Sequence, residues 1–388
     1  MTLLSSVTHK MRWILICATM SACLDTYETV LTKHDFGILI VDGFFTPNDT
    51  TKIKLSRTTT IDYSGPPRRE PAAYIQIENE QGNAFVMQSH DDGIYVLPPV
   101  NADLNANYRI HIQTPDAAEY NSEFTAVING HQIDSITWSE ENEVDDVVAF
   151  HLYSHDPKNS TNFYYWTYDE TWEYTSADFS VYYFENGQIL PRHLTTDIYY
   201  CWRTLSNQDF FLGNTSSLEQ DVVFDYRLTQ FPQRAIKFYF GYSMLVKQYG
   251  ISEKAFSYWQ MTKKNSENLG TIFDALPDQP ISNIRCSTDP GRKVVGYFGA
   301  TLVSNKRVFI SRQQLKGPTK YDFTGYELCP EELINPADMD EVHLAGKLIA
   351  HAVYDPIGGI LIGYTVAKKE CIDCRYHGGT ILKPDYWP

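Results

Sequence analysis

Apolar and polar residues alternate along the first third of the chain, in a pattern that predicts β-strands. Ile53 and Leu55 alternate with lysines, and Ile110 and Ile112 flank a histidine. A period of two places one side of a strand in a core and the other side in solvent. Short strands of this kind, separated by turn residues, predict a β-sandwich over residues 36–129.

A second, larger β-rich domain is expected over residues 130–388. Its most regular segment, NFYYWTYDETWEYTS, places five aromatic residues on one side of a strand: Tyr164, Trp166, Tyr168, Trp172 and Tyr174. This side is either a platform for a flat ligand such as a sugar or part of a sandwich core. We favour the core, because burial of one side explains the alternation without a ligand.

One helix interrupts the strands of the second domain. The stretch 252–269 has apolar residues at helical spacing, with Ser252 to cap its start and Gly270 to end it. After it, residues 293–310 are expected to form a hairpin that turns at Asn305 and Lys306. The fold class is therefore mainly β, with one or more inserted helices.

A further hairpin is expected over residues 351–367. Asp355-Pro356 and Gly358-Gly359 mark its turn. Beyond it, we expect His377-Gly378-Gly379 to form a turn that brings Tyr386 and Trp387 onto the body of the protein.

The first 22 residues have the composition of an export signal. Lys10 and Arg12 precede a short apolar stretch, residues 13–20, that cannot span a bilayer. The spacing Met20-Ser21-Ala22-Cys23 is similar to a bacterial lipobox. It predicts cleavage before Cys23 and attachment of acyl chains to that cysteine, as stable anchoring requires.

Two alternatives remain for this end of the chain. Ordinary signal cleavage near Ala22 would leave Cys23 without lipid, and translation from Met11 would shorten the leader. In the lipobox interpretation, the polar residues 23–35 form a tether between the lipid and the fold.

Whether the remaining cysteines pair depends on the compartment in which the protein resides. Five are left after the leader and Cys23: Cys201, Cys286, Cys329, Cys371 and Cys374. Exported cysteines usually pair, and an odd number leaves one thiol over. The C-x-x-C of Cys371 and Cys374 is a structural staple, a free or redox-active pair, or half of a metal site. We favour the staple and expect both to form disulfides, at least one of them with Cys201, Cys286 or Cys329.

Charge and motifs exclude several function classes. The net charge of −16 argues against nucleic-acid binding and against a basic surface on anionic lipid. The sequence contains no G-x-S-x-G, H-E-x-x-H, P-loop or dinucleotide motif. We interpret the acidic segment 140–146 as a solvated loop, and Asp169-Glu170 as a strand end or sheet edge. We therefore expect no catalytic residues, no metal and no cofactor.

Several ordered segments carry a resemblance to a known family. They are ILIVDGFFT, KIKLSRT, IDSITW, FYYWTYDETWEY, YCWRT, NLGTIFDALPDQPISNIRC, VVGYFGAT and ECIDCRYHGGTILKPDYWP. With the lipobox, this set resembles the DUF4249 family of Bacteroidota outer-membrane lipoproteins. The resemblance implies an immunoglobulin- or transthyretin-like N-terminal sandwich, followed by a β-rich domain particular to the family.

The resemblance also implies a role. Members of the family are typically encoded near TonB-dependent transporters of the SusC type. This context implies a lipid-anchored, cell-surface protein that is a non-catalytic ligand-capture or lid partner of such a barrel in nutrient uptake. The alternatives are a scaffold for an envelope complex and, less favoured, a secreted hydrolase. The sequence departs from the family pattern in one respect that bears on surface location. Surface lipoproteins of this phylum tend to carry a run of acidic residues just after the lipidated cysteine, whereas this chain has only Asp25 and Glu28 there.

Overall fold

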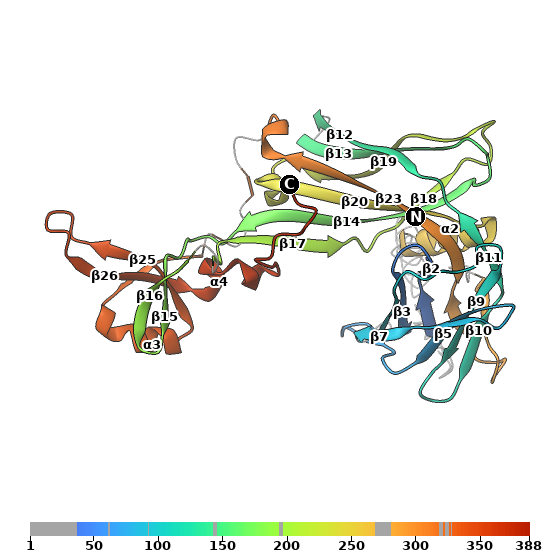
Figure 1. Cartoon of the computed structure of the whole chain (residues 1–388), viewed down its shortest axis with the longest axis horizontal. Coiled ribbons are helices and arrows are strands. Elements are labelled where there is room, and N and C mark those ends of the chain that lie inside the picture. The colour runs from blue at the N-terminus through green and yellow to red at the C-terminus, as the bar shows by residue number, and fades with distance from the viewer. Residues whose placement is uncertain are drawn as a thin grey trace, which may run out of the picture.

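The computed structural model describes residues 37–60, 63–91, 93–142, 146–193, 197–267, 281–317, 321–322, 326 and 328–388. The predicted leader, the lipidation site Cys23, the tether and Gly270 lie outside the described residues. The described chain is mainly β, as predicted. It forms an N-terminal sandwich, a central body and a C-terminal lobe that projects from the body (Figure 1).

The N-terminal sandwich has two sheets around one core. The first sheet contains, in spatial order, β22 (Val294–Gly296), β1 (Leu39–Asp42), β3 (Thr51–Arg57), β8 (Ile94–Leu97) and β7 (Gln88–Asp91), with β4 (Arg68–Arg69) beside β3. The second contains β11 (Thr125–Asn129), β9 (Asn107–Gln113), β10 (Glu119–Ser122) and β21 (Ile284–Cys286), with β5 (Tyr74–Asn79) beside β9 and β6 (Ala84–Val86) beside β5. The predicted alternation is confirmed, because Ile53, Leu55, Ile110 and Ile112 are buried between the sheets.

The sandwich extends beyond the predicted range 36–129. Strand β22 pairs in parallel with β1, and β21 pairs antiparallel with β10. Both strands follow the helix in sequence, so residues distant along the chain complete the first domain. An edge strand offers unpaired backbone groups that such a returning segment can satisfy.

The central body is a second sandwich. Its larger sheet continues from β11 through β23 (Gly299–Ser311), β20 (Gly241–Gly250), β14 (Phe163–Thr175) and β17 (Tyr200–Ser206), with β18 (Phe211–Asn214) beside β14 and β2 (Phe44–Phe45) beside β23. The facing sheet contains β12 (Ile133–Asn142), β13 (Asp146–Asp156) and β19 (Asp221–Pro232). The short helices of this region are η3 (Ile236–Phe238) and η4 (Arg312–Gln314).

The aromatic alternation of β14 reports burial, as predicted. Tyr164, Trp166, Tyr168, Trp172 and Tyr174 all belong to the core between the two sheets of the body. The opposite side of the strand is also covered, because Tyr165 packs under helix α2 (Glu253–Glu267). The platform interpretation therefore does not apply to these residues.

Three local predictions are wrong. Residues 140–142 and 146, expected in a solvated loop, belong to the paired strands β12 and β13. Residues 305 and 306 are not a hairpin tip but lie within the continuous strand β23, where Asn305 pairs with Lys247 of β20. Asp169 and Glu170 are not at a strand end or sheet edge, because β14 pairs with β17 on one side and β20 on the other. At Asn305-Lys306 and at Asp169-Glu170, polar residues occur inside a long strand because their side chains keep contact with solvent.

The C-terminal lobe combines two separate segments. It contains β24 (Glu332–Ile334), β26 (Leu361–Lys368) and β25 (Lys347–Tyr354) in one sheet, and β15 (Tyr182–Glu185) with β16 (Gln188–Pro191) in another. Its helices are η5 (Pro336–Asp338), α3 (Met339–Leu344), α4 (Lys369–Ile372) and η6 (Cys374–His377). The hairpin predicted to turn near 355–359 is confirmed as β25–β26.

Candidate functional site

A cavity of about 450 Å³ opens between helix α2 and the segment that leads into β21. It lies where the central body meets the N-terminal sandwich, beside α2 in Figure 1. This volume falls within the range of small-molecule sites, about 300–1,000 Å³. We refer to it as the helix cavity.

Helix α2 forms one wall because its two sides differ. Its start is capped by Ser252, whose hydroxyl accepts a hydrogen bond from the backbone N–H of Ala255 at 3.2 Å. The apolar side is buried through Ala255, Phe256, Tyr258 and Trp259, which pack on the outer side of β14. Packing of this side leaves Glu253, Ser257 and Met261, at i, i+4 and i+8, along the cavity.

The opposite wall is held by side chain-to-backbone hydrogen bonds. The Asn283 carboxamide donates from Nδ2 to the Phe298 carbonyl and accepts from the Phe298 N–H, both at 2.8 Å. Ser282 donates its hydroxyl to the Gly296 carbonyl at 2.6 Å. These bonds use the polar groups of Ser282 and Asn283 for structure. The wall is therefore fixed in place before any ligand arrives.

The floor of the helix cavity is aromatic. Tyr258 and Tyr297 lie with their ring centroids 5.6 Å apart, and both are largely buried. Burial raises the pKa of Tyr258 to about 12, so its hydroxyl is protonated at neutral pH. The rings offer an apolar surface for a ligand.

The rim carries charges of both signs. Glu123, Glu253, Lys254 and Arg285 line the opening, and none of the four forms an ion pair with a residue that the structure describes. Charges that lack a partner among the described residues can contact a ligand. The described lining residues thus offer charged, hydrogen-bonding and apolar groups to a ligand.

A partly buried carboxyl, Asp42, lies near the aromatic cluster beneath α2. Burial raises its pKa, and Lys54, which pairs with it across β1 and β3, opposes the rise. A raised pKa in the folded state means that folding favours the protonated form. The stability that this group contributes is present below pH 3.8, the ordinary value, and is lost as the pH rises through the folded pKa.

Asp42→Asn is therefore expected to stabilise the protein at pH 7, because the amide removes the cost of burying an ionised carboxyl. The gain should shrink as the pH falls through the raised folded pKa of Asp42, where the wild-type carboxyl becomes protonated. Urea unfolding of both proteins between pH 4 and pH 7 measures this difference. A gain that does not change with pH would contradict the assignment.

Of the five cysteines considered as disulfide candidates from the sequence, four form disulfides and one is a free thiol. Cys201 is bonded to Cys374, and Cys329 to Cys371. Both cysteines of the C-x-x-C motif are thus in disulfides with distant partners, as expected for a staple, and neither is left for a redox pair or a metal. Cys286, a disulfide candidate on the sequence, is instead a free, buried thiol. It lies on β21, in the core of the N-terminal sandwich, away from the other four.

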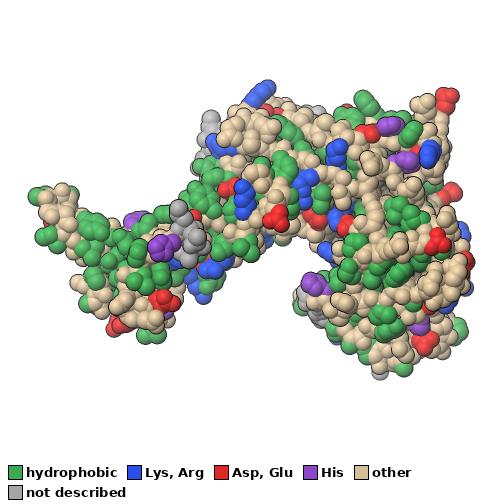
Figure 2. Space-filling model, in the orientation of Figure 1, with side chains coloured by type: hydrophobic (Ala, Val, Ile, Leu, Met, Phe, Trp, Pro, Cys, Tyr) green, Lys and Arg blue, Asp and Glu red, His purple; other side chains and the backbone are tan. Residues whose placement is uncertain are grey.

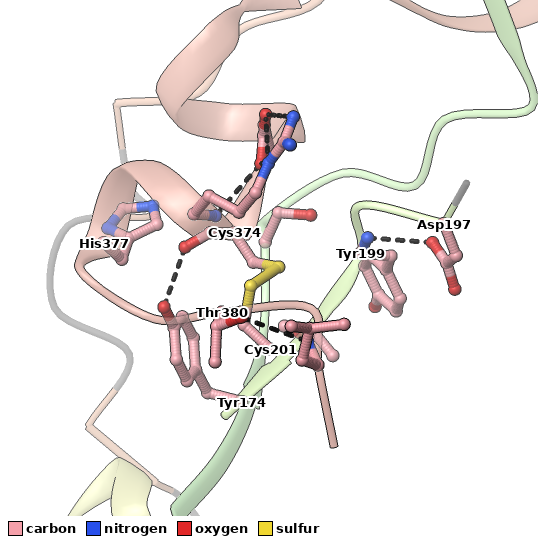
Figure 3. The surroundings of a disulfide bond; sticks show 12 residues. Tyr174, Asp197, Tyr199, Cys201, Cys374, His377 and Thr380 are labelled. Atoms are coloured by element: carbon pink, nitrogen blue, oxygen red, sulfur yellow. Dashed lines mark hydrogen bonds and ion pairs between the residues drawn. A yellow bond between two sulfur atoms is a disulfide. The ribbon is translucent and has the colours of Figure 1, made fainter. Parts of the chain in front are cut away.

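Hydrogen bonds surround the Cys201–Cys374 disulfide (Figure 3). Tyr174 donates its hydroxyl to the Cys374 carbonyl at 2.7 Å. Trp202 and Thr380 exchange two backbone hydrogen bonds, of 2.8 and 2.9 Å. Gly379 allows this close approach, because a Cβ there would overlap the Tyr174 hydroxyl. The tail is therefore joined to β14 and β17 by both covalent and polar contacts.

The end of the tail reaches the central body, as predicted. The Tyr386 hydroxyl lies 2.9 Å from the Thr171 hydroxyl, and the Arg307 guanidinium stacks 3.6 Å above the Tyr386 ring. Trp387 packs against Phe309.

The residues of the helix cavity were not identified from the sequence. On a surface helix, exposed Glu253, Lys254 and Ser257 have the pattern of an ordinary solvated side. Only the placement of Arg285 and Tyr297 opposite them shows a cavity. Among the residues that the structure describes, no helix is both long and apolar enough to cross a membrane.

Comparison with known proteins identifies one family. The model of a family described as a domain of unknown function, DUF4249, matches residues 25–307, which is more than half of the chain. The match includes the N-terminal sandwich, helix α2 and the walls of the helix cavity. No curated protein matches the chain.

Proposed function

We propose, from the premise that the chain belongs to the DUF4249 family, that it is a lipid-anchored outer-membrane protein that captures a small ligand for a TonB-dependent transporter of the SusC type. It would hold the ligand without catalysing a reaction and pass it to the barrel during nutrient uptake. The observation that carries this proposal is the helix cavity, with its aromatic floor and with rim charges that form no ion pair within the described part of the chain.

The lining of the helix cavity favours a ligand of mixed character. Lys254 and Arg285 can bind a carboxylate, whereas Glu123 and Glu253 can bind an ammonium or several hydroxyls. Tyr258 and Tyr297 can cover an apolar portion. A short peptide combines these groups, and an oligosaccharide offers hydroxyls and an apolar ring face. We favour the short peptide because it engages both signs of charge.

The sequence supports the location. The lipobox-like stretch before Cys23 would attach acyl chains, and the polar residues that follow would separate the lipid from the fold. The strongly negative net charge leaves the acyl chains, rather than a basic surface, as the anchor to an anionic membrane.

A charge reversal in the helix cavity tests ligand capture. With a panel of short peptides and oligosaccharides, titration calorimetry should find a saturable ligand, and Arg285→Glu should weaken a carboxylate-bearing ligand about tenfold or more. This loss corresponds to about 1.4 kcal/mol or more, as expected when an attractive contact becomes repulsive.

A matched control for this experiment is the pair Lys254→Glu and Lys264→Glu. Both positions are exposed on helix α2, but only Lys254 lines the helix cavity. Lys254→Glu should weaken binding, and Lys264→Glu should leave it unchanged. Equal effects, or no saturable binding across the panel, would contradict capture in this cavity and favour a scaffolding role.

A further inference from the structure

The free end of the C-terminal lobe is an apolar turn. In Figure 1 the β25–β26 hairpin forms the part of the lobe farthest from the body, and in Figure 2 hydrophobic side chains gather around its end. Ile357 and Ile360 are 97% and 71% exposed, and Leu361 and Ile362 are exposed beside them. We refer to residues 355–362 as the apolar tip. Four aliphatic side chains at the end of a projection differ from the isolated exposed apolar residues of an ordinary surface.

Charge is almost absent from this hairpin. Between Lys347 and Lys368 the only ionised side chain at neutral pH, apart from any protonated His351, is Asp355. Tyr354, at the end of β25, lies directly behind the apolar tip and is half exposed. Along the projection, the aliphatic residues thus come first, Tyr354 and the ionised Asp355 next, and the lysines at the base.

Four backbone N–H groups of the apolar tip have hydrogen-bond partners within it. The Asp355 carboxylate accepts hydrogen bonds from the N–H groups of Ile357 and Gly358, at 2.7 and 3.0 Å. The Asp355 carbonyl accepts from the Gly359 N–H, and the Asp355 N–H donates to the Ile360 carbonyl. Pro356 has no N–H to satisfy. The turn can therefore leave water while these backbone donors keep their partners, which removes much of the cost of burying a loop.

The neighbouring strands limit how much of the hairpin can leave water. Strand β24 pairs with β26 only as far as Tyr364, opposite Ile334. Beyond that point both edges of the hairpin have open backbone groups, which are not tolerated in hydrocarbon. Only the apolar tip, and not the strands behind it, is suited to an apolar environment.

We propose that the apolar tip inserts into the surface of a lipid bilayer, with Ile357 and Ile360 in the hydrocarbon and Tyr354 at the level of the head groups. Tyrosine is enriched at that level, and aliphatic side chains gain free energy by leaving water. Because no lysine or arginine lies between Lys347 and Lys368 and the chain carries a charge of −16, the lipid would be zwitterionic rather than anionic. A pocket in a partner protein would also accept the isoleucines, but it would not require a tyrosine directly behind them. The insertion goes beyond the proposed ligand capture and does not depend on it.

A fluorescent label near the tip tests the proposal. Gly358→Cys places a thiol for an environment-sensitive nitrobenzoxadiazole (NBD) dye at a position where a Cβ meets only the Ile360 side chain at 3.6 Å. The full chain is mixed with phosphatidylcholine vesicles. We expect the dye emission to shift to the blue and to be quenched by lipids that carry a shallow quencher. The buried thiol of Cys286 should react little, and the chain without the added cysteine measures that background.

Two variants separate insertion from simple attachment. Ile357→Asp combined with Ile360→Asp should abolish the blue shift, and because both side chains are exposed, the fold should be retained. A label at Gln81→Cys, in the exposed β5–β6 turn, should keep a water-like emission even when the protein is attached by other means. If the dye at position 358 keeps a water-like emission on vesicles, the proposal is overturned. The apolar tip would then be expected to bind a pocket in a partner protein.

Discussion

Replacing Cys201 and Cys374 together by alanine is expected to lower the free energy of unfolding by about 5 kcal/mol. This disulfide joins residues 173 apart in sequence, and a cross-link over so long a span removes much conformational entropy from the unfolded chain. In the folded protein it joins the tail to β17, next to the hydrogen bond between Tyr174 and Cys374. Urea unfolding followed by far-ultraviolet circular dichroism measures the loss.

Two other cysteine variants serve as comparisons. Removal of Cys329–Cys371, which spans 42 residues, should cost somewhat less, about 4 kcal/mol. Cys286→Ala, which breaks no disulfide, should cost only about 1 kcal/mol for the lost packing. If the Cys201 and Cys374 double variant lost no more than Cys286→Ala, the disulfide would not be the staple of the tail.

Glu170→Gln is expected to cost about 2–3 kcal/mol of stability. The Glu170 carboxylate lies 2.6 Å from the Lys237 ammonium, and these side chains are only 14% and 17% exposed. The same oxygen accepts a hydrogen bond from the Tyr242 hydroxyl at 3.0 Å. Removing the carboxylate leaves the ammonium among aromatic rings without its counter-charge, which is costly when a pair is largely removed from water.

Lys237 makes this loss specific. Its ammonium lies 3.4 Å from the centroid of the Phe231 ring, and burial lowers its pKa while Glu170 opposes the change. The ring's π electrons attract the cation but cannot replace a carboxylate. The stabilisation therefore depends on the pair rather than on either residue alone.

An exposed ion pair provides the control. Glu332 pairs with Lys347 in the C-terminal lobe, where the two side chains are 54% and 28% exposed. Glu332→Gln should change stability by no more than about 0.5 kcal/mol, because water and salt screen exposed pairs. Both variants are unfolded under the same conditions. If Glu170→Gln lost no more free energy of unfolding than Glu332→Gln, the stabilising role of the Glu170–Lys237 pair would be contradicted.

The strands of the core could be predicted because their pattern is local. The alternation in β3 and β9 corresponds to burial at nearly every position, and the five aromatic residues predicted for one side of β14 are all buried. The helix was also predicted, because Ser252 and the apolar side of α2 are neighbours in sequence. Local sequence is sufficient where one side of an element decides its burial.

The remaining features depend on pairing between distant segments. The return of β21 and β22 to the first sandwich joins residues that lie more than a hundred positions apart. Glu170 is kept within a central strand by Lys237, from a different part of the chain. The helix cavity also requires α2 and β21 to face each other, and neither segment alone indicates this. For the same reason the sequence predicted a disulfide staple without specifying its partners.

The proposed capture of a ligand and the proposed insertion of the apolar tip use different ends of the molecule. The helix cavity lies between the body and the N-terminal sandwich, whereas the apolar tip is at the far end of the C-terminal lobe (Figure 1). In these two proposals the protein is held to a membrane both by acyl chains and by the apolar tip, and two attachments would restrict its orientation. Such an orientation would present the helix cavity consistently to a neighbouring barrel.

Copurification from native membranes shows whether the protein is bound to a TonB-dependent barrel. The tagged protein is recovered from gently solubilised outer membranes, and its partners are identified by mass spectrometry. The account predicts a TonB-dependent barrel in stoichiometric amount, retained in the Ile357→Asp and Ile360→Asp double variant, whose altered tip faces lipid rather than the barrel. No barrel, from membranes in which the protein itself is abundant, would contradict the transporter-partner role.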